Sequence, residues 1–287
     1  MKLLNFIKDD SIRLGVKDER GIIDVWQAAA DHSLDVPTDM KAVIEQGAEA
    51  LKKIEDLKKD SIEFIREEEI VFCPCVTDPE KIICVGLNYM NHIAEAKMDV
   101  PKYPVLFSKF NNALAAHNQK ITLPETAVKY DYEAELVAVI GKKASRVTKE
   151  EALSYVFGYT AGNDLSARDL QMRTGQWLLG KSCDGFAPIG PYLVTADEVD
   201  PNDLDIECVV NGELRQSDNT SNMLFDCAAV ISYVSQYMTL KPGDIIFSGT
   251  PSGPIMGYPE DEQRWLKPGD EVTVSVGKIC SLTNIME

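Results

Sequence analysis

The amino-acid sequence predicts an α+β fold that is rich in β-strands and divided into two domains. From residue 76 onward, short apolar runs bounded by turn residues outnumber the segments with helical periodicity. Before that point, a hairpin pattern precedes a single amphipathic helix, which is typical of a small α/β unit. We therefore expect a small N-terminal domain over residues 1–75 and a larger, strand-rich domain over residues 76–287.

The N-terminal domain is predicted to contain a hairpin. Residues 11–17 alternate between apolar and polar side chains, residues 18–21 have turn character, and residues 21–25 return as the partner strand. Residues 40–59 place apolar side chains at helical spacing among lysines and glutamates, which indicates one amphipathic helix. We find no catalytic pattern in this part of the sequence.

The larger domain is predicted to consist mostly of strands. They cover residues 81–85, 105–107, 135–140, 192–194, 205–210, 245–247 and 271–276. The expected helices cover residues 149–155, 164–172 and 222–238. The dipeptide Asn211-Gly212 lies between Val210 and Glu213 and predicts a two-residue hairpin turn, because both of its residues tolerate positive φ.

Composition and charge exclude several classes of function. The chain has 287 residues, 45% of them hydrophobic, which is enough for a sizeable core. Its net charge of -17 opposes binding to nucleic acid or to an anionic membrane, since both would be repelled. No apolar run has the length of a membrane helix or of a signal-peptide core, so we expect a cytoplasmic protein. The seven cysteines are odd in number and scattered, which indicates reduced thiols without a catalytic role.

Two carboxylates stand one residue apart next to the apolar run 136–140. Because strand side chains alternate in direction, Glu133 and Glu135 are expected to point to the same side, about 7 Å apart along the backbone. A hard cation between them would relieve their repulsion, and oxygen ligands favour Mg²⁺, Mn²⁺ or Ca²⁺ over zinc. A solvated strand face is the alternative explanation for such a pair on its own.

A second polar cluster lies further along the chain. Asn163 or Asp164 suits the N-cap position of the expected helix 164–172, because short polar side chains accept hydrogen bonds from the first amides of a helix. In such a helix Asp164, Arg168 and Gln171 share one face, as they would in a solvated amphipathic helix. Together with the two glutamates, Asp164 would give three carboxylates for one ion. About three of six coordination positions would then stay open for water or substrate.

A third group lies upstream, where the apolar run 82–85 leads through Gly86 into a short segment with His92 and Glu95. If that segment is helical, the two side chains are neighbours, and the carboxylate can orient the imidazole or share a water with it. Such a pair has the composition of a general acid/base dyad. A surface pair is the alternative.

The motifs occur in the order found in one protein family. From about residue 80 to residue 287 the chain contains, in this order, G-L-N-Y-x-x-H-x-x-E, D-Y-E-A-E-L, N-D-L-S-A-R-D-L-Q, G-K-S, V-N-G-E-L-R-Q, L-K-P-G-D-I-I-F-S-G-T-P-S-G and K-P-G-D-x-V. In these segments it resembles the fumarylacetoacetate hydrolase (FAH) superfamily. The resemblance implies the mixed β-sandwich roll of that family, with residues 1–75 as a small cap domain.

The resemblance also implies roles for the carboxylates and the dyad. Glu133, Glu135 and Asp164 would bind a divalent metal, usually Mg²⁺. His92 and Glu95 would activate a water molecule from a lid segment. All five residues fall on matching positions of the family motifs.

The resemblance places further residues around the substrate. These are Arg168, Gln171, Lys181 and Thr250. Lys109 matches another position at the edge of the pocket, although the residue after it is not the proline that the family often has there. Lys181 also fits on chemical grounds, because it follows Gly180 and precedes Gly185, Pro188, Gly190 and Pro191, which predict a loop in which a fixed cation can meet an anionic oxygen or an enolate.

Residues 175–182 also fit the phosphate-loop pattern G-x-x-x-x-G-K-[ST]. We reject nucleotide binding, since that loop needs a strand before it, a helix after it and small residues within it. Here a predicted helix precedes the segment, and Trp177 with two leucines fills its centre.

We expect a divalent-metal-dependent hydrolase that cleaves a carbon-carbon bond in a 2,4-dioxo acid, such as an acylpyruvate or a fumarylacetoacetate-like compound, with dyad-activated water. The same metal-enolate site suits isomerisation of 2-hydroxyhepta-2,4-diene-1,7-dioate or decarboxylation of oxaloacetate, so these alternatives stay open. A non-catalytic metal-binding module would not need His92, Glu95 and Lys181. The expected partner is a small anionic dicarbonyl substrate, and the resemblance implies a homodimer.

Overall fold

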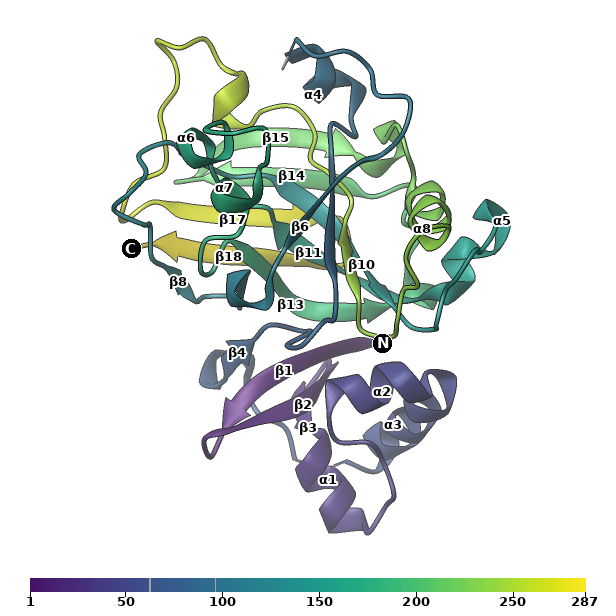
Figure 1. The fold of residues 1–287 in the computed structure, drawn as a ribbon. Helices are drawn as coiled ribbons and strands as arrows, with labels where there is room; N and C mark the ends of the chain where they lie inside the picture. The colour runs from purple at the N-terminus through teal and green to yellow at the C-terminus, as the bar shows by residue number, and fades with distance from the viewer. Residues whose placement is uncertain (62, 96) are drawn as a thin grey trace.

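The computed structural model of the chain describes residues 1–61, 63–95 and 97–287. Its strands form an 11-stranded, a 5-stranded and a 2-stranded sheet, and short helices surround them (Figure 1). The β-rich α+β fold predicted from the sequence is confirmed. Among the described residues, no helix has both the length and the apolar character needed to cross a membrane. The seven cysteines are free thiols, as expected.

The strands and helices have the following bounds. The 11-stranded sheet contains β1 (Lys2–Lys8), β2 (Ser11–Asp18), β3 (Gly21–Asp24), β4 (Val71–Cys73), β5 (Ile82–Gly86), β6 (Val105–Lys109), β7 (Leu114–Ala115), β10 (Ala134–Ile140), β11 (Val156–Asn163), β13 (Ala187–Thr195) and β16 (Ile245–Phe247). The 5-stranded sheet contains β8 (Lys120–Ile121), β14 (Asp205–Val210), β15 (Glu213–Asn219), β17 (Glu271–Val276) and β18 (Cys280–Met286), and the third sheet pairs β9 (Tyr130–Asp131) with β12 (Ser166–Ala167). The helices are α1 (Val25–His32), α2 (Met40–Gln46), α3 (Ala48–Asp60), α4 (Met90–Glu95), α5 (Lys149–Ala152), α6 (Arg168–Gln171), α7 (Leu178–Lys181) and α8 (Cys227–Ser235). Single 3₁₀ turns are η1 (Glu67–Glu69), η2 (Asn111–Ala113), η3 (Leu153–Tyr155), η4 (Ala196–Glu198), η5 (Thr220–Asn222) and η6 (Ile255–Gly257).

Strand β10 is buried on both faces because it lies in the middle of the large sheet. Leu136 and Ala138 belong to the core shared with the 5-stranded sheet. Val137 and Val139 point the other way and belong to the core that includes apolar side chains of α2 and α3. Burial on both sides explains why the run 136–140 is apolar without alternation.

The N-terminal part confirms the expected hairpin, formed by β2 and β3. The helix expected over residues 40–59 is instead two helices, α2 and α3, which meet at Gly47. Gly47 has φ 59° and ψ -125°, a conformation that a residue without Cβ adopts easily and that interrupts helical geometry.

Strand β1 pairs with β2 on one edge and with β13 on the other, so the large sheet runs without a break across the expected boundary near residue 75. That boundary stays a prediction.

The Asn211-Gly212 hairpin is confirmed: both residues have positive φ, and they join β14 to β15.

Two of the expected helices are shorter than predicted. The first half of the helix expected over residues 164–172 is wrong. Ser166 and Ala167 form β12 and pair with β9, so the helix α6 begins only at Arg168. The helix expected over residues 222–238 is also shorter, because the side chain of Asp226 caps α8 by accepting a hydrogen bond from the backbone N–H of Ala229.

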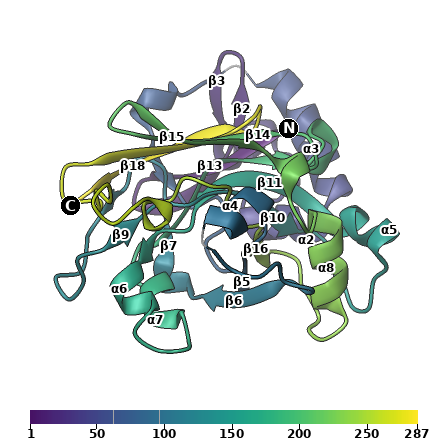
Figure 2. The same ribbon diagram turned by 90° about the horizontal axis from the view of Figure 1, so that it is seen from above.

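Helix α4 lies at the opposite end of the molecule from α1 (Figure 1). Figure 2 looks down on α4, with α6 and α7 on one side of it and α8 on the other. The segments that contain the predicted functional residues therefore gather at the end of the molecule that is remote from the N-terminal helices.

Candidate active site

The three carboxylates expected to bind metal come together where β10 begins. Strand β10 pairs antiparallel with β11, with Ala134 opposite Asn163, so the start of one strand lies beside the end of the other. The backbone N–H of Asp164 donates to the carbonyl oxygen of Glu133 at 2.9 Å. One carboxylate oxygen from each of Glu133, Glu135 and Asp164 lies within 4.8 Å of the others, and all three residues are buried.

Buried cations surround two of these carboxylates. Lys181 Nζ lies 2.8 Å from Glu133 Oε2 and 2.8 Å from Asp164 Oδ2. Lys109 Nζ lies 2.6 Å from Asp164 Oδ1. Arg168 Nη2 lies 2.6 Å from Glu133 Oε1. Burial by itself raises the pKa of Glu133, but the charges of Lys181 and Arg168 outweigh that effect and hold the pKa below its usual range.

Of the three carboxylates, Glu135 has the least opposing positive charge next to it. Among the described residues it has no ion pair like those of Glu133 and Asp164, and Oε2 accepts a hydrogen bond from the backbone N–H of Gly249 at 2.7 Å. Burial raises the pKa of Glu135 well above its usual range, and the charges of Asp164 and Glu133 raise it further. A hard divalent cation between the three carboxylates would oppose this repulsion, so the donor set fits the expected metal.

The predicted dyad lies on α4. His92 Nδ1 is 3.4 Å from Glu95 Oε2, and the same oxygen accepts a hydrogen bond from the backbone N–H of Gly253 at 3.1 Å. Gly257 packs directly against this carboxylate: a Cβ on Gly257 would lie 2.2 Å from Glu95 Cδ. The expected helical segment with neighbouring His92 and Glu95 is therefore present, and a turn from the 253–257 segment supports it.

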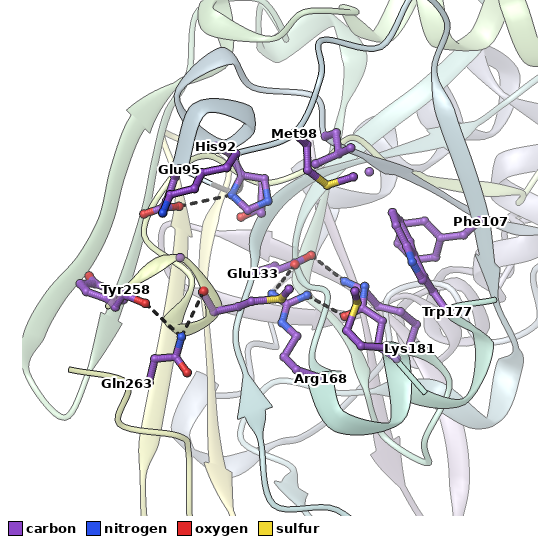
Figure 3. Close-up of a pocket in the computed structure, with 18 of the residues that line it drawn as sticks. His92, Glu95, Met98, Phe107, Glu133, Arg168, Trp177, Lys181, Tyr258 and Gln263 are labelled. Atoms are coloured by element: carbon purple, nitrogen blue, oxygen red, sulfur yellow. Dashed lines mark hydrogen bonds and ion pairs between the residues drawn. The ribbon is translucent and has the colours of Figure 1, made fainter. Parts of the chain in front are cut away.

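A cavity of about 670 Å³ is lined by the dyad and by Glu133, the member of the carboxylate cluster that reaches it within the described residues. Figure 3 shows His92 and Glu95 on one side of it, Glu133 with its two cations below, and an aromatic wall formed by Phe107 and Trp177. The two rings pack edge to face with centroids 5.4 Å apart. Trp177 also packs against Gly86, where a Cβ would lie 2.7 Å from the indole ring. The cavity thus combines a charged floor with an apolar side.

Besides the dyad, four residues that were expected around the substrate line this cavity. They are Arg168, Gln171, Lys181 and Thr250. Arg168 Nη1 donates to Gln171 Oε1 at 2.9 Å, which holds the amide against the guanidinium. Thr250 Oγ1 donates to the carbonyl oxygen of Ala134 at 2.9 Å and accepts a hydrogen bond from Gln216 Nε2 at 2.8 Å. Lys181 is the last residue of α7 rather than part of the expected loop.

The position of Lys109 corrects the expected substrate contact. Its side chain is fully buried and, within the described residues, is absent from the lining of the cavity. Besides its ion pair with Asp164, Nζ donates to the carbonyl oxygens of Leu165 at 3.1 Å and Phe186 at 2.7 Å, and to that of Lys181. Lys109 therefore neutralises Asp164 from behind and ties the surrounding loops together.

Asp131 is a further buried member of the site that was not expected from the sequence. Arg168 Nε donates to Asp131 Oδ2 at 2.8 Å, so the guanidinium lies between Asp131 and Glu133. With Asp131 included, the buried charge cluster beneath the dyad contains four carboxylates and three cations, and its own charges nearly balance. A signal was available, since Asp131, Glu133 and Glu135 continue the alternation of a strand. Trp177 and Gln216 gave no such signal, because their roles depend on which strands the fold brings together.

The chain is similar to known proteins over most of its length. Residues 81–287 match the family described as fumarylacetoacetate (FAA) hydrolase, C-terminal. The chain is 42% identical to the fumarylacetoacetate hydrolase domain-containing protein 2 homolog of Dictyostelium discoideum, over 99% of this chain and 96% of that protein. It is 40% identical to the mitochondrial oxaloacetate tautomerase of Xenopus laevis, over 99% of this chain and 89% of that protein.

Among solved structures, the fumarylacetoacetate hydrolase of Exiguobacterium antarcticum has a TM-score of 0.82 and 34% sequence identity to this chain. The superposition covers 100% of this chain and 99% of that one, so it includes the N-terminal part as well as the site. The family match over residues 81–287 and the identity of at least 40% to relatives over 99% of the chain therefore show that the chain belongs to the fumarylacetoacetate hydrolase family.

Proposed function

We propose that this protein catalyses metal-dependent keto-enol tautomerisation of a small 2-oxo dicarboxylate of the oxaloacetate type. The observation behind this proposal is the arrangement of the cavity, which is lined by an acid/base dyad and by Glu133 of the buried carboxylate triad, with Lys181 and Arg168 beside Glu133. The name of the 40% identical Xenopus laevis relative supports the choice of substrate. Tautomerisation needs only a base, an acid and stabilisation of an enolate, and the cavity lining offers residues suited to all three.

Glu133, Glu135 and Asp164 would hold the divalent cation, with Mg²⁺ as the first candidate and Mn²⁺ or Ca²⁺ as alternatives. Such an ion supplies positive charge for the carboxylate and carbonyl oxygens of a 2-oxo acid. The side chain of Lys181 adds a second fixed cation next to Glu133, and Arg168 adds a third. These charges would favour the enolate over the neutral ketone.

Proton transfer is assigned to the dyad on α4. Glu95 would take a proton from the carbon beside the carbonyl group. The electron pair of the broken C–H bond would form the carbon-carbon double bond of the enolate, and the π electrons of the carbonyl group would move onto its oxygen. His92 Nδ1 lies 3.4 Å from Glu95 Oε2 and would orient the Glu95 carboxylate. It would also exchange the proton that Glu95 has taken with solvent or with the enolate oxygen. No carbon-carbon bond breaks and no water is consumed, so the reverse reaction uses the same groups.

Hydrolysis of a 2,4-dioxo acid stays the second candidate, as the sequence predicted. The apolar wall of Phe107 and Trp177 favours it, because oxaloacetate has no apolar end that would fill that side of the cavity. The name of the structural neighbour from Exiguobacterium antarcticum agrees with this alternative. Isomerisation of an unsaturated hydroxy-dioate or decarboxylation of oxaloacetate would use the same enolate-stabilising groups, and the homodimer and the cytoplasmic location also stay predictions.

Substitutions in the dyad test the proposed roles. We expect His92→Ala and Glu95→Gln each to reduce tautomerase turnover by about 10²- to 10⁴-fold, the usual contribution of a general acid or base. Metal affinity should be retained, because neither residue is a member of the carboxylate cluster. Turnover is followed by the ultraviolet absorbance of the enol and metal binding by calorimetry. His32→Ala, at the exposed end of α1, is the matched control.

The same variants, assayed for release of pyruvate from an acylpyruvate, separate the two candidate functions. If wild-type protein hydrolyses acylpyruvates efficiently but does not speed the loss of the oxaloacetate enol, the tautomerase proposal is wrong and the hydrolase is correct. If both single variants keep wild-type rates in both assays, the dyad is only a surface pair.

Gly257 allows a test that leaves the catalytic groups themselves unchanged. In Gly257→Ala the new methyl group would lie 2.2 Å from Glu95 Cδ, so the carboxylate must move. A displacement on the order of 1 Å at a catalytic group costs about 10²-fold in rate. The backbone of Gly257 is not in the positive-φ region, so stability should change little. Gly175→Ala, where a Cβ meets no atom within 4 Å, is the control, and unchanged turnover in Gly257→Ala would contradict a role for Glu95 at its present position.

A further inference from the structure

Asp131 is a fully buried carboxylate that is not a member of the metal-binding cluster. Its two oxygens accept four hydrogen bonds. Oδ1 accepts from the backbone N–H groups of Tyr132 at 3.0 Å and Ile255 at 2.7 Å. Oδ2 accepts from Met256 N–H at 3.1 Å and from Arg168 Nε at 2.8 Å. A carboxylate with this many donors is held in one orientation, and it holds its donors equally firmly.

The donors come from two separate parts of the site. Arg168 belongs to α6 and donates from Nη2 to Glu133 Oε1 at 2.6 Å, so this part reaches the carboxylate triad. Ile255 and Met256 belong to the turn η6, which ends at Gly257. They lie more than a hundred residues from Asp131 in sequence, and their two amides lie side by side on its carboxylate.

The turn η6 in turn supports the dyad. Gly257 touches the carboxylate of Glu95 so closely that there is no room for a Cβ, and Gly253, just before the turn, donates its N–H to the same carboxylate at 3.1 Å. The described contacts form a continuous path from Glu133 through Arg168 and Asp131 to the turn and then to Glu95. The path consists of two ion pairs, two backbone hydrogen bonds and one van der Waals contact.

We propose that Asp131 is a positioning residue that sets the distance between the enolate-stabilising side of the cavity and the general base Glu95. It acts through Arg168 on one side and through the turn η6 on the other, and it does not line the cavity within the described residues. This proposal rests on the proposed function, since it assumes that Glu95 transfers the proton. It predicts that loss of the Asp131 charge misplaces Glu95 without removing any group that would touch substrate.

Asp131→Asn is the test, because it keeps the shape and leaves one oxygen to accept from Tyr132 and Ile255. Its new NH₂ group would face Arg168 Nε and Met256 N–H, which are both donors, so the link to the turn should open. We expect a loss of about 10²-fold in turnover, as for a displaced catalytic group. In a Glu95→Gln background the same substitution should cost much less, because the base is already absent. Equal losses in both backgrounds would show a merely structural role and overturn the proposal.

Asp244→Asn provides the matched control. Asp244 is equally buried and also accepts backbone hydrogen bonds, from Lys81 at 2.9 Å and Lys241 at 2.8 Å, but it lies at the other end of β10. We expect lower thermal stability in this variant and unchanged turnover per folded molecule.

Amide hydrogen exchange tests the link without any substrate. In Asp131→Asn the amides of Ile255 and Met256 should exchange faster than in wild type, relative to the amides of β18, and in Asp244→Asn they should not. Faster exchange with no tautomerase or hydrolase activity in the wild type would reject the proposed function and keep the structural link. Unchanged exchange at both amides would reject the link itself. If Asp131→Asn cannot be purified, Asp131→Glu replaces it, since it keeps the charge but displaces it by one methylene. The loss of turnover in Asp131→Glu is then compared between the wild-type and Glu95→Gln backgrounds.

Discussion

Replacing Glu135 by Gln is expected to abolish divalent-cation binding and turnover together, while the metal-free protein stays at least as stable as the wild type. Glu135 is buried beside two other carboxylates, and its raised pKa shows that the folded protein disfavours its charge. An amide of the same shape removes that repulsion and one metal ligand at once. Calorimetric titration with Mg²⁺ or Mn²⁺ and thermal unfolding without metal are the two measurements.

The pH dependence of stability follows from the same shift. Because the folded-state pKa of Glu135 lies above its unfolded value, the folded metal-free protein holds a proton that the unfolded chain releases. Stability from this group is fully present below the ordinary pKa of a glutamate and is lost as pH rises toward the folded-state pKa. Glu135→Gln should remove this loss of stability at rising pH. The control Glu207→Gln, on strand β14 outside the carboxylate cluster, should not remove it.

Unchanged metal affinity in Glu135→Gln would reject the carboxylate cluster as the metal site.

Asp164 should behave differently from Glu135 although both are candidate ligands. Asp164 is paired with Lys109 and Lys181, and all three side chains are buried. Asp164→Asn would leave two buried ammonium groups with less opposing charge, and breaking a buried pair costs about 3–5 kcal/mol. Loss of metal binding in this variant therefore needs to be measured on protein shown to be folded, whereas Glu135→Gln avoids that complication.

Lys181→Met is expected to separate metal binding from catalysis. The ammonium group is shared by Glu133 and Asp164, so its removal should leave Mg²⁺ affinity unchanged or increase it. Turnover should fall by about 10²- to 10³-fold, the usual effect of removing one group that stabilises a developing oxyanion. The loss should appear in kcat more than in KM if Lys181 acts on the enolate rather than on the bound ketone.

The controls for Lys181→Met are Lys181→Arg, which keeps the charge, and Lys120→Met, which removes an exposed lysine from β8. Partial recovery in the arginine variant would support an electrostatic role. Wild-type kinetics in Lys181→Met would mean that the enolate forms elsewhere, and loss of metal binding would mean that the lysine organises the carboxylates rather than the substrate.

The candidate site was predictable where neighbouring residues act together. His92 and Glu95 lie on one helix, and Glu133 and Glu135 lie on one extended segment, so spacing alone placed each pair. Asp164 was grouped with the two glutamates as a third carboxylate, but it was expected on a helix, which is the wrong local structure. The antiparallel register of β10 and β11, rather than a helix, brings it to the glutamates, and a sequence does not show which strands will pair.

Long-range contacts explain the other differences. Lys109 was expected at the edge of the pocket because it matches a family position, yet the carbonyl oxygens that surround its ammonium group come from segments distant in sequence. The break at Gly47 has a local cause and could have been anticipated from that glycine. The continuous sheet formed by β1 and β13 could not, because it joins residues almost two hundred positions apart.

The near balance of charge inside the site has a consequence for how substrate arrives. The four carboxylates and three cations of the buried charge cluster leave almost the whole net charge of -17 on the rest of the molecule. A dicarboxylate is therefore repelled at long range and attracted only after it enters the cavity. Dissolved ions screen the outer field beyond about 8–10 Å but screen the buried cations much less. Collisions that lead to binding should become more frequent as ionic strength rises, which is the opposite of the behaviour of enzymes that steer anions with a basic surface.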